Sequence, residues 1–323
     1  MSNRKNKKVF LAGHEGLVGK SLYRNLDSQN NLVIVATRDE LDLTNQHDVN
    51  KFFQTHQFDE VYIAAARVGG ILANSTFPAN FIYENLMIQN NLIHASHQND
   101  INKLLFLGSS CIYPVNSSQP IQEDSLLSGP LEKTNRAYSV AKIAGIEMCN
   151  SYNFQYGRDF RCVMPTNLYG PHDNFNPKNS HVIPSLILKF HEAANKNYKE
   201  VIIWGSGSPL REFMHVHDMT MACIHVMSLA PDHYKNLISD NGTHLNIGTG
   251  NEITIKDLAL LIQKITKYEG KIIFDKNYPD GAPRKLLDSS LLIESGFNCE
   301  YDLEKGLKST YQWFKKNINY LRS

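Results

Sequence analysis

The sequence predicts an α/β fold, built from a doubly wound parallel sheet and a smaller second α/β domain. Short unbroken apolar runs such as Val9–Ala12 and Leu104–Leu107 have the length of strands buried on both faces of a parallel sheet. Amphipathic segments with helical spacing separate these runs. The 323 residues are enough for one large unit or two packed domains with a sizeable core.

The composition is that of an ordinary globular protein, with 42% hydrophobic and 20% charged residues. The 33 basic and 32 acidic residues leave a net charge of +1, which argues against binding to nucleic acid or an anionic membrane. Five scattered cysteines without paired spacing fit a reducing cytoplasm better than disulfides, and they predict no metal site. The basic start lacks the apolar core of a signal peptide, and no run reaches membrane-span length, so we expect a cytoplasmic protein.

A glycine-rich turn follows the first strand and precedes the amphipathic segment Lys20–Leu26. Glycine permits close backbone approach, and a helix N-terminus points unpaired N–H groups at a pyrophosphate, so this order predicts a Rossmann dinucleotide site. The Gly-x-x-Gly-x-x-Gly spacing is weak evidence alone, because glycines also mark plain turns. The candidate cofactor residues in this turn are Gly13, His14, Glu15, Gly16, Leu17, Val18 and Gly19.

The second strand, Leu32–Ala36, ends in a turn whose charges bear on cofactor choice. Arg38 favours the 2′-phosphate of NADP, whereas Asp39 and Glu40 keep NAD open, because a carboxylate here binds the ribose hydroxyl. Asp42 and Leu43 follow, where a side chain can contact the adenine.

A third run, Val61–Ala66, ends in small residues that let a cofactor lie close. The helix that we expect over Phe81–His94 has Phe81, Asn85 and Ile88 on one face.

The stretch Lys103–Pro114 joins a predicted central strand to polar chemistry. The strand stops at Gly108 and is followed at once by two serines and Cys111. If the chain stays extended, the two-residue period turns Ser109 and Cys111 to the same side. Parallel sheets bind ligands at this end of their strands, although most free cysteines are simply small buried residues.

A polar loop over 115–136, long enough to be functional, leads to Tyr138 and Lys142, which open a helical segment over Val140–Tyr152. Residues four apart share a helix face, so the phenol and the ammonium lie side by side. A tyrosine with a pKa of about 10 needs a nearby cation for acid–base work at neutral pH. Such a pair also occurs on ordinary surfaces.

These motifs, in this order, resemble the extended short-chain dehydrogenase/reductases. The segments GHEGLVG, AAARVGGI, FLGSSCIYP, YSVAKIAGIEMC, MPTNLYGPHDNF, SHVIP, WGSGSPLREFMHV and PDGAPRKLLD narrow the resemblance to NADPH-dependent epimerase/reductases that act on GDP-4-keto-6-deoxy-D-mannose. One departure is Glu15, at a position where such proteins commonly carry a basic residue. Without that basic residue, binding of the 2′-phosphate depends more on Arg38.

The resemblance implies a GDP-sugar substrate, NADPH as cofactor and GDP-L-fucose as product. In that chemistry Ser109 and Tyr138 bind the ketone oxygen, and Lys142 binds the nicotinamide ribose and depresses the pKa of Tyr138. Inversion at C3 and C5 needs a base and an acid, for which the candidates are Cys111 and His181, in the loop Asn174–Val182. A histidine in a polar loop is otherwise usually just solvated.

The resemblance also assigns the remaining site residues. Further cofactor contacts are Leu107, Gly108, Ser109, Tyr138, Lys142, Pro165, Thr166, Asn167, Leu168 and His181. Candidates for the diphosphate, guanine and sugar are Lys189, Trp204, Arg211, Asp280 and Arg284. Without the resemblance, a core tryptophan and surface ion pairs are the ordinary interpretation of this last set.

We expect residues 1–170, with about 214–248, to form the cofactor domain, and 171–213 with 249–323 to form the substrate domain. Amphipathic helices are expected over Ile255–Thr266 and Leu303–Lys315. The resemblance leads us to expect a homodimer. Three rivals stay open: a C4-reductase of a related GDP-4-keto sugar such as a heptose, an NAD-retaining 4-epimerase or dehydratase, and a non-catalytic dinucleotide sensor. The first has no use for Cys111 and His181, and the last has none for Tyr138 and Lys142.

Overall fold

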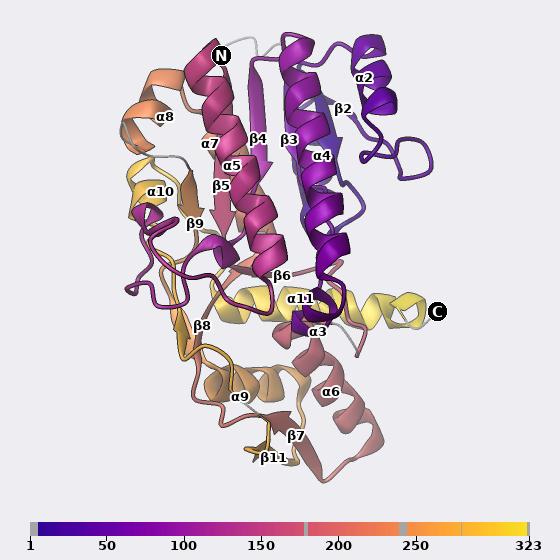
Figure 1. Cartoon of the computed structure of the whole chain (residues 1–323). Helices are drawn as coiled ribbons and strands as arrows, with labels where there is room; N and C mark the ends of the chain where they lie inside the picture. Colours follow the sequence, from indigo (N-terminus) through magenta and orange to yellow (C-terminus); the bar gives the residue numbers. More distant parts are fainter. Residues whose placement is uncertain (1–5, 178–179, 239–243, 279, 322–323) are drawn as a thin grey trace.

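A six-stranded parallel sheet forms the centre of the computed structural model, which describes residues 6–177, 180–238, 244–278 and 280–321 (Figure 1). The strand order is β2-β1-β3-β4-β5-β9, and every neighbouring pair is parallel. The chain order reverses between β1 and β3, and ligands bind beside such a switch point. The strands are β1 (Lys8–Ala12), β2 (Leu32–Ile34), β3 (Glu60–Ile63), β4 (Lys103–Leu107), β5 (Asp159–Pro165) and β9 (Leu245–Ile247).

Helices cover both faces of this sheet, so that two apolar cores form. On one face lie α2 (Gln46–Thr55), α4 (Pro78–Gln98) and α5 (Arg136–Tyr156), and Figure 1 shows α4 and α5 side by side in front of the strands. On the other face α1 (Leu17–Asp27) packs against α7 (Val216–Ser228). Three short helices complete this part: α3 (Ile71–Thr76), α8 (Pro231–Ile238) and α10 (Ser290–Glu294).

A smaller α/β module lies below the carboxyl ends of the central strands (Figure 1). Its own core contains Phe190, Leu258 and Phe314. One sheet pairs β8 (Leu210–His215) with β10 (Glu252–Thr254), β12 (Arg284–Lys285) and β6 (Asn167–Tyr169), and a second pairs β7 (Glu200–Trp204) with β11 (Lys271–Asp275). The helices are α6 (Val182–Lys196), α9 (Ile255–Thr266) and α11 (Leu303–Leu321).

Local sequence signals explain several helix ends. Pro78 begins α4, where its missing N–H costs nothing, and Gly157 ends α5 in a left-handed conformation with φ of 65°. The Thr254 side chain accepts a hydrogen bond from Asp257 N and so caps α9. No helix in the described ranges is both long enough and apolar enough to cross a membrane.

The predicted α/β class and the doubly wound parallel sheet are confirmed. The α9 bounds match the prediction, α4 and α5 are longer than predicted, and α11 continues to Leu321. β2 and β3 are shorter, since they end at Ile34 and Ile63.

The expected extended chain beyond Gly108 is wrong. Ser109 is extended, but Ser110–Ile112 form a 3₁₀ helix whose first turn the Ser109 hydroxyl caps by accepting from Cys111 N at 3.5 Å. Serine competes in this way for backbone donors and ends the strand geometry.

Candidate active site

Four of the predicted catalytic side chains meet at the carboxyl end of β4. Ser109 and Cys111 follow this strand, while Tyr138 and Lys142 lie one turn apart near the start of α5. The Ser109 side chain is hydrogen-bonded to the Tyr138 hydroxyl, and the Cys111 thiol is close enough to influence the pKa of Tyr138. A further bond fixes the two segments together, because the Ser139 hydroxyl donates to Cys111 O at 2.9 Å.

Lys142 is buried, with 3% of its surface exposed. Its Nζ donates to Leu107 O at 2.7 Å and lies 5.8 Å from the centre of the Tyr138 ring. Burial lowers the pKa of Lys142 to about 8, although the nearby Cys111 and Cys162 oppose the shift. The ammonium is therefore held at the strand end, close to the phenol.

Burial also raises the pKa of Tyr138, Cys111 adds to the increase, and only the hydrogen bond from Ser109 opposes it. Burial dominates this shift and the ammonium of Lys142 donates to Leu107 O, so the expectation that Lys142 depresses the pKa of Tyr138 stays a prediction. At neutral pH Tyr138 is a protonated phenol, which suits it to donate a proton.

His181 stands at the N-terminus of α6, in the smaller module, with an exposed side chain. The surrounding protein lowers the pKa of its imidazole by partial desolvation. The neutral ring is thus favoured. Its predicted role as acid and cofactor contact stays a prediction.

The glycine turn has the shape that a dinucleotide requires. Gly13 has a φ of +88°, and a Cβ there would lie 2.5 Å from Ala65 N, while a Cβ on Gly19 would lie 1.9 Å from Gly13 O. Beside Gly16 the space is open, with only Gly13 O at 3.8 Å from a Cβ built there. No side chain caps the N-terminus of α1, and His14 Nδ1 is buried without a hydrogen-bond partner among the described residues. These groups fit a pyrophosphate.

The carboxylates after β2 are bound within their own turns. Glu40 accepts from Thr37 N and Oγ1 at 2.8 and 2.9 Å, and these bonds lower its pKa. Asp42 similarly accepts from Thr44 N and Oγ1, at 2.9 and 2.7 Å. Arg38 is exposed beside them, which favours a 2′-phosphate over a ribose hydroxyl.

Two other segments complete the predicted cofactor site. Leu43 packs against the core beside α4, and its carbonyl accepts from Asn91 Nδ2 at 2.9 Å. Gly108 N donates to Val163 O at 2.9 Å, so the end of β4 stays beside β5. The segment of Pro165, Thr166, Asn167 and Leu168 runs from β5 in the large sheet into β6 of the smaller module.

The substrate candidates lie in the smaller module. Lys189 Nζ is 5.5 Å from the centre of the Trp204 ring. The carboxylate of Asp280 accepts from Ser206 N and Oγ at 2.8 and 2.6 Å, and it lies close enough to raise the pKa of Arg211 against the lowering by burial. Arg284 differs from Lys189 and Arg211, because its Nε donates to the Glu252 carboxylate at 2.7 Å and its charge is therefore already paired.

Lys285 is a site residue that the sequence analysis missed. Burial lowers the pKa of its ammonium, and its nearby charged groups are Cys111, Arg211 and Glu132. It therefore lies near both the Cys111 thiol and Arg211, one of the predicted diphosphate residues. The signal was the strand period: if Arg284 points to one face of β12, its neighbour points to the other.

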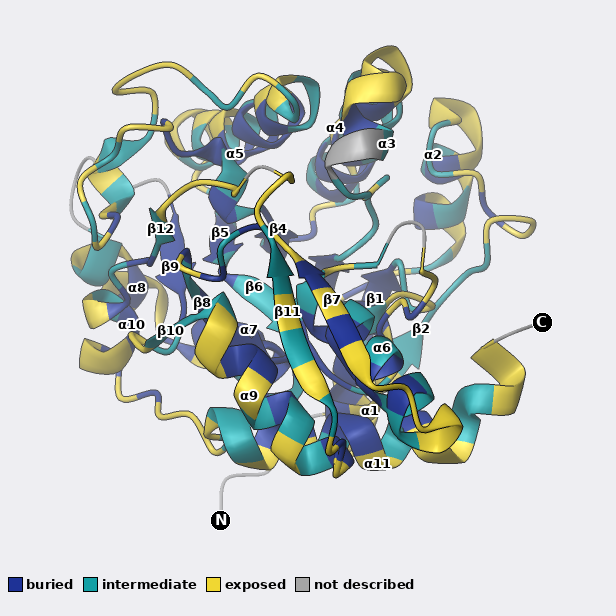
Figure 2. Ribbon diagram, turned by 90° about the horizontal axis from the view of Figure 1, so that it is seen from below, coloured by how far each residue is buried: buried dark blue, intermediate teal, exposed yellow. Residues whose placement is uncertain are grey.

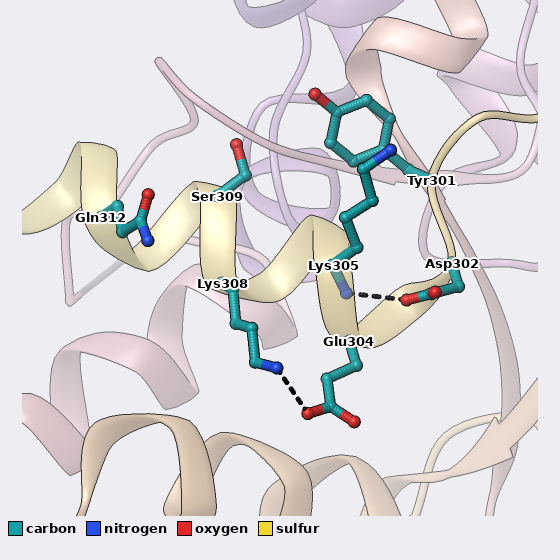
Figure 3. A pocket seen from close by; sticks show the side chains of 7 residues that line it. All are labelled: Tyr301, Asp302, Glu304, Lys305, Lys308, Ser309 and Gln312. Carbon is teal, nitrogen blue, oxygen red and sulfur yellow. Dashed lines mark hydrogen bonds and ion pairs between the residues drawn. The ribbon is translucent and has the colours of Figure 1, made fainter.

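Two surface cavities lie away from these residues. One, of about 570 Å³, is lined by solvated charges of α11 such as Glu304 and Lys308, which pair at 2.8 Å (Figure 3). Another, of about 690 Å³, includes Lys7, Glu60 and Lys103 at the amino ends of the central strands. Because parallel sheets bind ligands at the carboxyl ends, neither cavity is the candidate active site.

The chain is similar to known proteins over most of its length. Residues 9–248 match the model of the NAD dependent epimerase/dehydratase family. GDP-L-fucose synthase of Escherichia coli (strain K12) is 55% identical over 98% of both chains. A GDP-6-OMe-4-keto-L-xylo-heptose reductase from C. jejuni superposes with a TM-score of 0.89 at 38% identity, covering 97% of this chain and 98% of that one. A GDP-L-fucose synthetase from Naegleria fowleri bound to NADP superposes with a TM-score of 0.88 at 26% identity, and the match covers 100% of this chain and 97% of that one. The chain belongs to the NAD dependent epimerase/dehydratase family and, within it, to the group that contains these GDP-L-fucose synthases.

Proposed function

We propose that this protein converts GDP-4-keto-6-deoxy-D-mannose to GDP-L-fucose, by epimerisation at C3 and C5 followed by NADPH-dependent reduction at C4. The observation that carries the proposal is the meeting of Ser109, Cys111, Tyr138 and Lys142 at the carboxyl end of β4. The full-length similarity to the E. coli GDP-L-fucose synthase supports the same substrate.

Reduction at C4 uses Ser109 and Tyr138, the two residues that bind the ketone oxygen. NADPH, when bound along the glycine turn, supplies the hydride. Tyr138 is protonated at neutral pH and donates a proton to the developing alkoxide, while Ser109 donates a hydrogen bond to the same oxygen. Lys142 places a positive charge beside the phenol and so stabilises the phenolate that this transfer leaves.

Epimerisation uses two further groups. The protons on C3 and C5 are acidified by the adjacent ketone, and inversion requires removal on one face and return on the other. Cys111 shares its surroundings with Tyr138 and Lys142, which supports it as the base. His181 is assigned as the acid, which returns a proton to carbon from its imidazolium form, and its lowered pKa makes that form a stronger proton donor. Ser109 and Tyr138 bind the enolate oxygen as they bind the alkoxide.

The division of labour between the two modules is part of the proposal. Residues 1–170 with about 214–248 hold NADPH, and residues 171–213 with 249–323 hold the GDP-sugar, although α10 packs on β9 of the large sheet and β6 pairs with β8 of the smaller module. The pairing of β9 with β5 and the packing of α7 on α1 support this assignment of 214–248. Lys189 and Arg211 neutralise the diphosphate, while Trp204 and Asp280 contact the guanine or the sugar.

A second candidate is a C4-reductase of a GDP-4-keto-heptose, which the similarity to the C. jejuni reductase favours. Such an enzyme transfers a hydride without inverting carbons, so it does not require Cys111 as a base. The thiol beside Tyr138 therefore favours the epimerase/reductase.

The test supplies GDP-4-keto-6-deoxy-D-mannose with NADPH or NADH, follows cofactor oxidation by absorbance and identifies the product by NMR. We expect GDP-L-fucose, with NADPH preferred. A product reduced at C4 with unchanged C3 and C5 would support the simple reductase. Tightly held NAD in the purified protein, with no net oxidation, would support a 4-epimerase or dehydratase.

We also propose that the enzyme is a cytoplasmic homodimer. Five free cysteines suit a reducing compartment. α4 and α5 carry exposed aromatic side chains, including Tyr83 and Phe154, which a second copy can cover.

A further inference from the structure

Trp204 is exposed to an unusual degree for a tryptophan. Along β7 buried and exposed residues alternate, so Val201 and Ile203 enter the core of the smaller module while Trp204 has 63% of its surface exposed. Figure 2 shows this alternation of buried and exposed residues on β7, which pairs with β11. A large aromatic surface left open in this way is typical of a binding site.

A second aromatic ring lies flat against this indole. The chain turns after β11, with Tyr278 N donating to Asp275 O at 3.4 Å and Asn277 N donating to Asp275 Oδ1 at 3.0 Å. The turn brings the Tyr278 ring to 4.4 Å from the Trp204 ring, with 10° between their planes. Tyr278 is itself 42% exposed, so the stacked pair remains open to solvent.

Charged groups suited to a nucleotide surround this pair. Lys189 Nζ lies 5.5 Å from the centre of the indole ring and is held there by Ile202 O at 3.2 Å. Asp280 follows Tyr278 by two residues and is fixed by Ser206. A flat aromatic surface beside a cation and a carboxylate fits a base linked to a diphosphate.

We propose that Tyr278 is a base-contacting residue, and that the guanine of the substrate packs against the Trp204–Tyr278 pair. This inference rests on the proposed GDP-sugar substrate. Because Tyr278 covers one face of the indole and Lys189 also lies over that ring, the base stacks on the outward face of Tyr278, and a purine covers more of that face than a pyrimidine does. The residue therefore contributes to the preference for guanine over uracil nucleotides.

The experiment measures the dissociation constants of GDP and UDP by calorimetry, with the enzyme saturated with NADP. Tyr278→Ala is expected to weaken GDP binding on the order of tenfold and to weaken UDP binding less. Tyr278→Phe keeps the stacked ring and should stay within about twofold of the wild type. The matched control is Tyr198→Ala, since Tyr198 is 50% exposed in the same module but precedes β7 at its other end. Unchanged NADPH affinity shows that each variant is folded.

The outcomes separate this inference from the proposed function. If the wild type binds GDP more tightly than UDP and Tyr278→Ala binds GDP equally well, the role of Tyr278 is refuted while the GDP-sugar assignment stands. If the wild type binds UDP as tightly as GDP, or binds neither, the substrate assignment fails and the guanine contact fails with it. A loss in Tyr278→Phe equal to that in Tyr278→Ala would also overturn the stacking role.

Discussion

The buried ammonium of Lys142 lowers the free energy of unfolding, because its charge is desolvated in the folded protein. Its pKa of about 8 lies below the 10.5 of an ordinary lysine in water, so folding disfavours the charged form. The penalty is fully present below pH 8 and is relieved as the pH rises from 8 towards 10.5. Lys142→Met is therefore expected to abolish reduction and yet raise the free energy of unfolding at pH 7 by about 1 to 3 kcal/mol, after the lost hydrogen bond to Leu107 O is counted.

Denaturant unfolding at pH 7 and pH 9.5 measures this effect. The gain should be smaller at the higher pH, because the wild-type lysine is then largely neutral when folded. Lys308→Met, at an exposed lysine of α11, is the control and should change stability by less than about 0.5 kcal/mol. A destabilised Lys142→Met at both pH values would show that the ammonium contributes to the fold instead of weakening it.

Cys111 is the residue on which inversion depends. Cys111→Ser keeps the size of the side chain but removes the thiol, since a serine hydroxyl is far less acidic. We expect exchange of the C3 and C5 protons with deuterated solvent to fall by at least about 100-fold, while NADPH binding is unchanged. NMR of the recovered substrate measures the exchange, and a normal exchange rate would exclude Cys111 as the base.

Arg38 carries the prediction on cofactor choice. Because Glu40 and Asp42 are bound to their own turns, the exposed guanidinium is the group available for a 2′-phosphate. Arg38→Ala should weaken NADPH about 10- to 100-fold and leave NADH nearly unchanged. Fluorescence titration of both cofactors measures this, and equal weakening would place the phosphate elsewhere.

At the scale of the elements, two glycines of the glycine turn have different roles: Gly19 is needed for packing, and Gly16 leaves space for the cofactor. Gly19 packs against its own turn, where a Cβ would lie 1.9 Å from Gly13 O, whereas the space beside Gly16 is open. Gly19→Ala is expected to destabilise the protein by about 1 to 3 kcal/mol and to lose NADPH. Gly16→Ala should cost less than about 0.5 kcal/mol but weaken NADPH at least about tenfold, because its methyl group enters the space for the pyrophosphate.

Thermal unfolding and cofactor titration of these two variants form the measurement. Equal loss of stability in both would mean that the turn is packed throughout, with no space for a ligand. Full NADPH affinity in Gly16→Ala would show that the pyrophosphate lies elsewhere.

The elements also show which inferences a sequence permits. The proximity of Tyr138 and Lys142 follows from the helical period alone, so it could be predicted. The 3₁₀ helix after Ser109 could not be predicted. It depends on one local hydrogen bond, in which Cys111 N donates to the Ser109 side chain instead of to a neighbouring strand.

At the scale of the whole molecule, long-range pairing limits prediction further. The parallel sheet follows from short apolar runs, but the neighbours of β8 come from β6, β10 and β12, at widely separated places in the chain. Lys285 and Tyr278 join the site only through such pairings, as β12 adds to β8 and β11 adds to β7. The strand period relates Lys285 to its neighbour Arg284, but no local pattern marks Tyr278.

Assembly is the last property at this scale. Phe154, on α5, is 95% exposed, and Val140 lies about four helical turns earlier on the same face. Tyr83 is a further exposed aromatic residue, on α4, which packs beside α5 (Figure 1). A two-fold symmetric dimer through α4 and α5 would bury the patch from both copies at once. Each phenylalanine removed from water contributes about 2 to 3 kcal/mol, and a charge in its place adds a desolvation cost.

Phe154→Glu is therefore expected to raise the dimer dissociation constant by at least about 100-fold, with little change in the stability of the monomer, because the side chain is solvated in a single copy. Analytical ultracentrifugation over a range of concentrations measures this shift. Tyr320→Glu is the matched control, since Tyr320 is also highly exposed but lies on α11, away from the patch. A monomeric wild type, or a Phe154→Glu variant that dimerises as the wild type does, would reject α4 and α5 as the interface. If only Tyr320→Glu dissociates, the contact between copies lies on α11 instead.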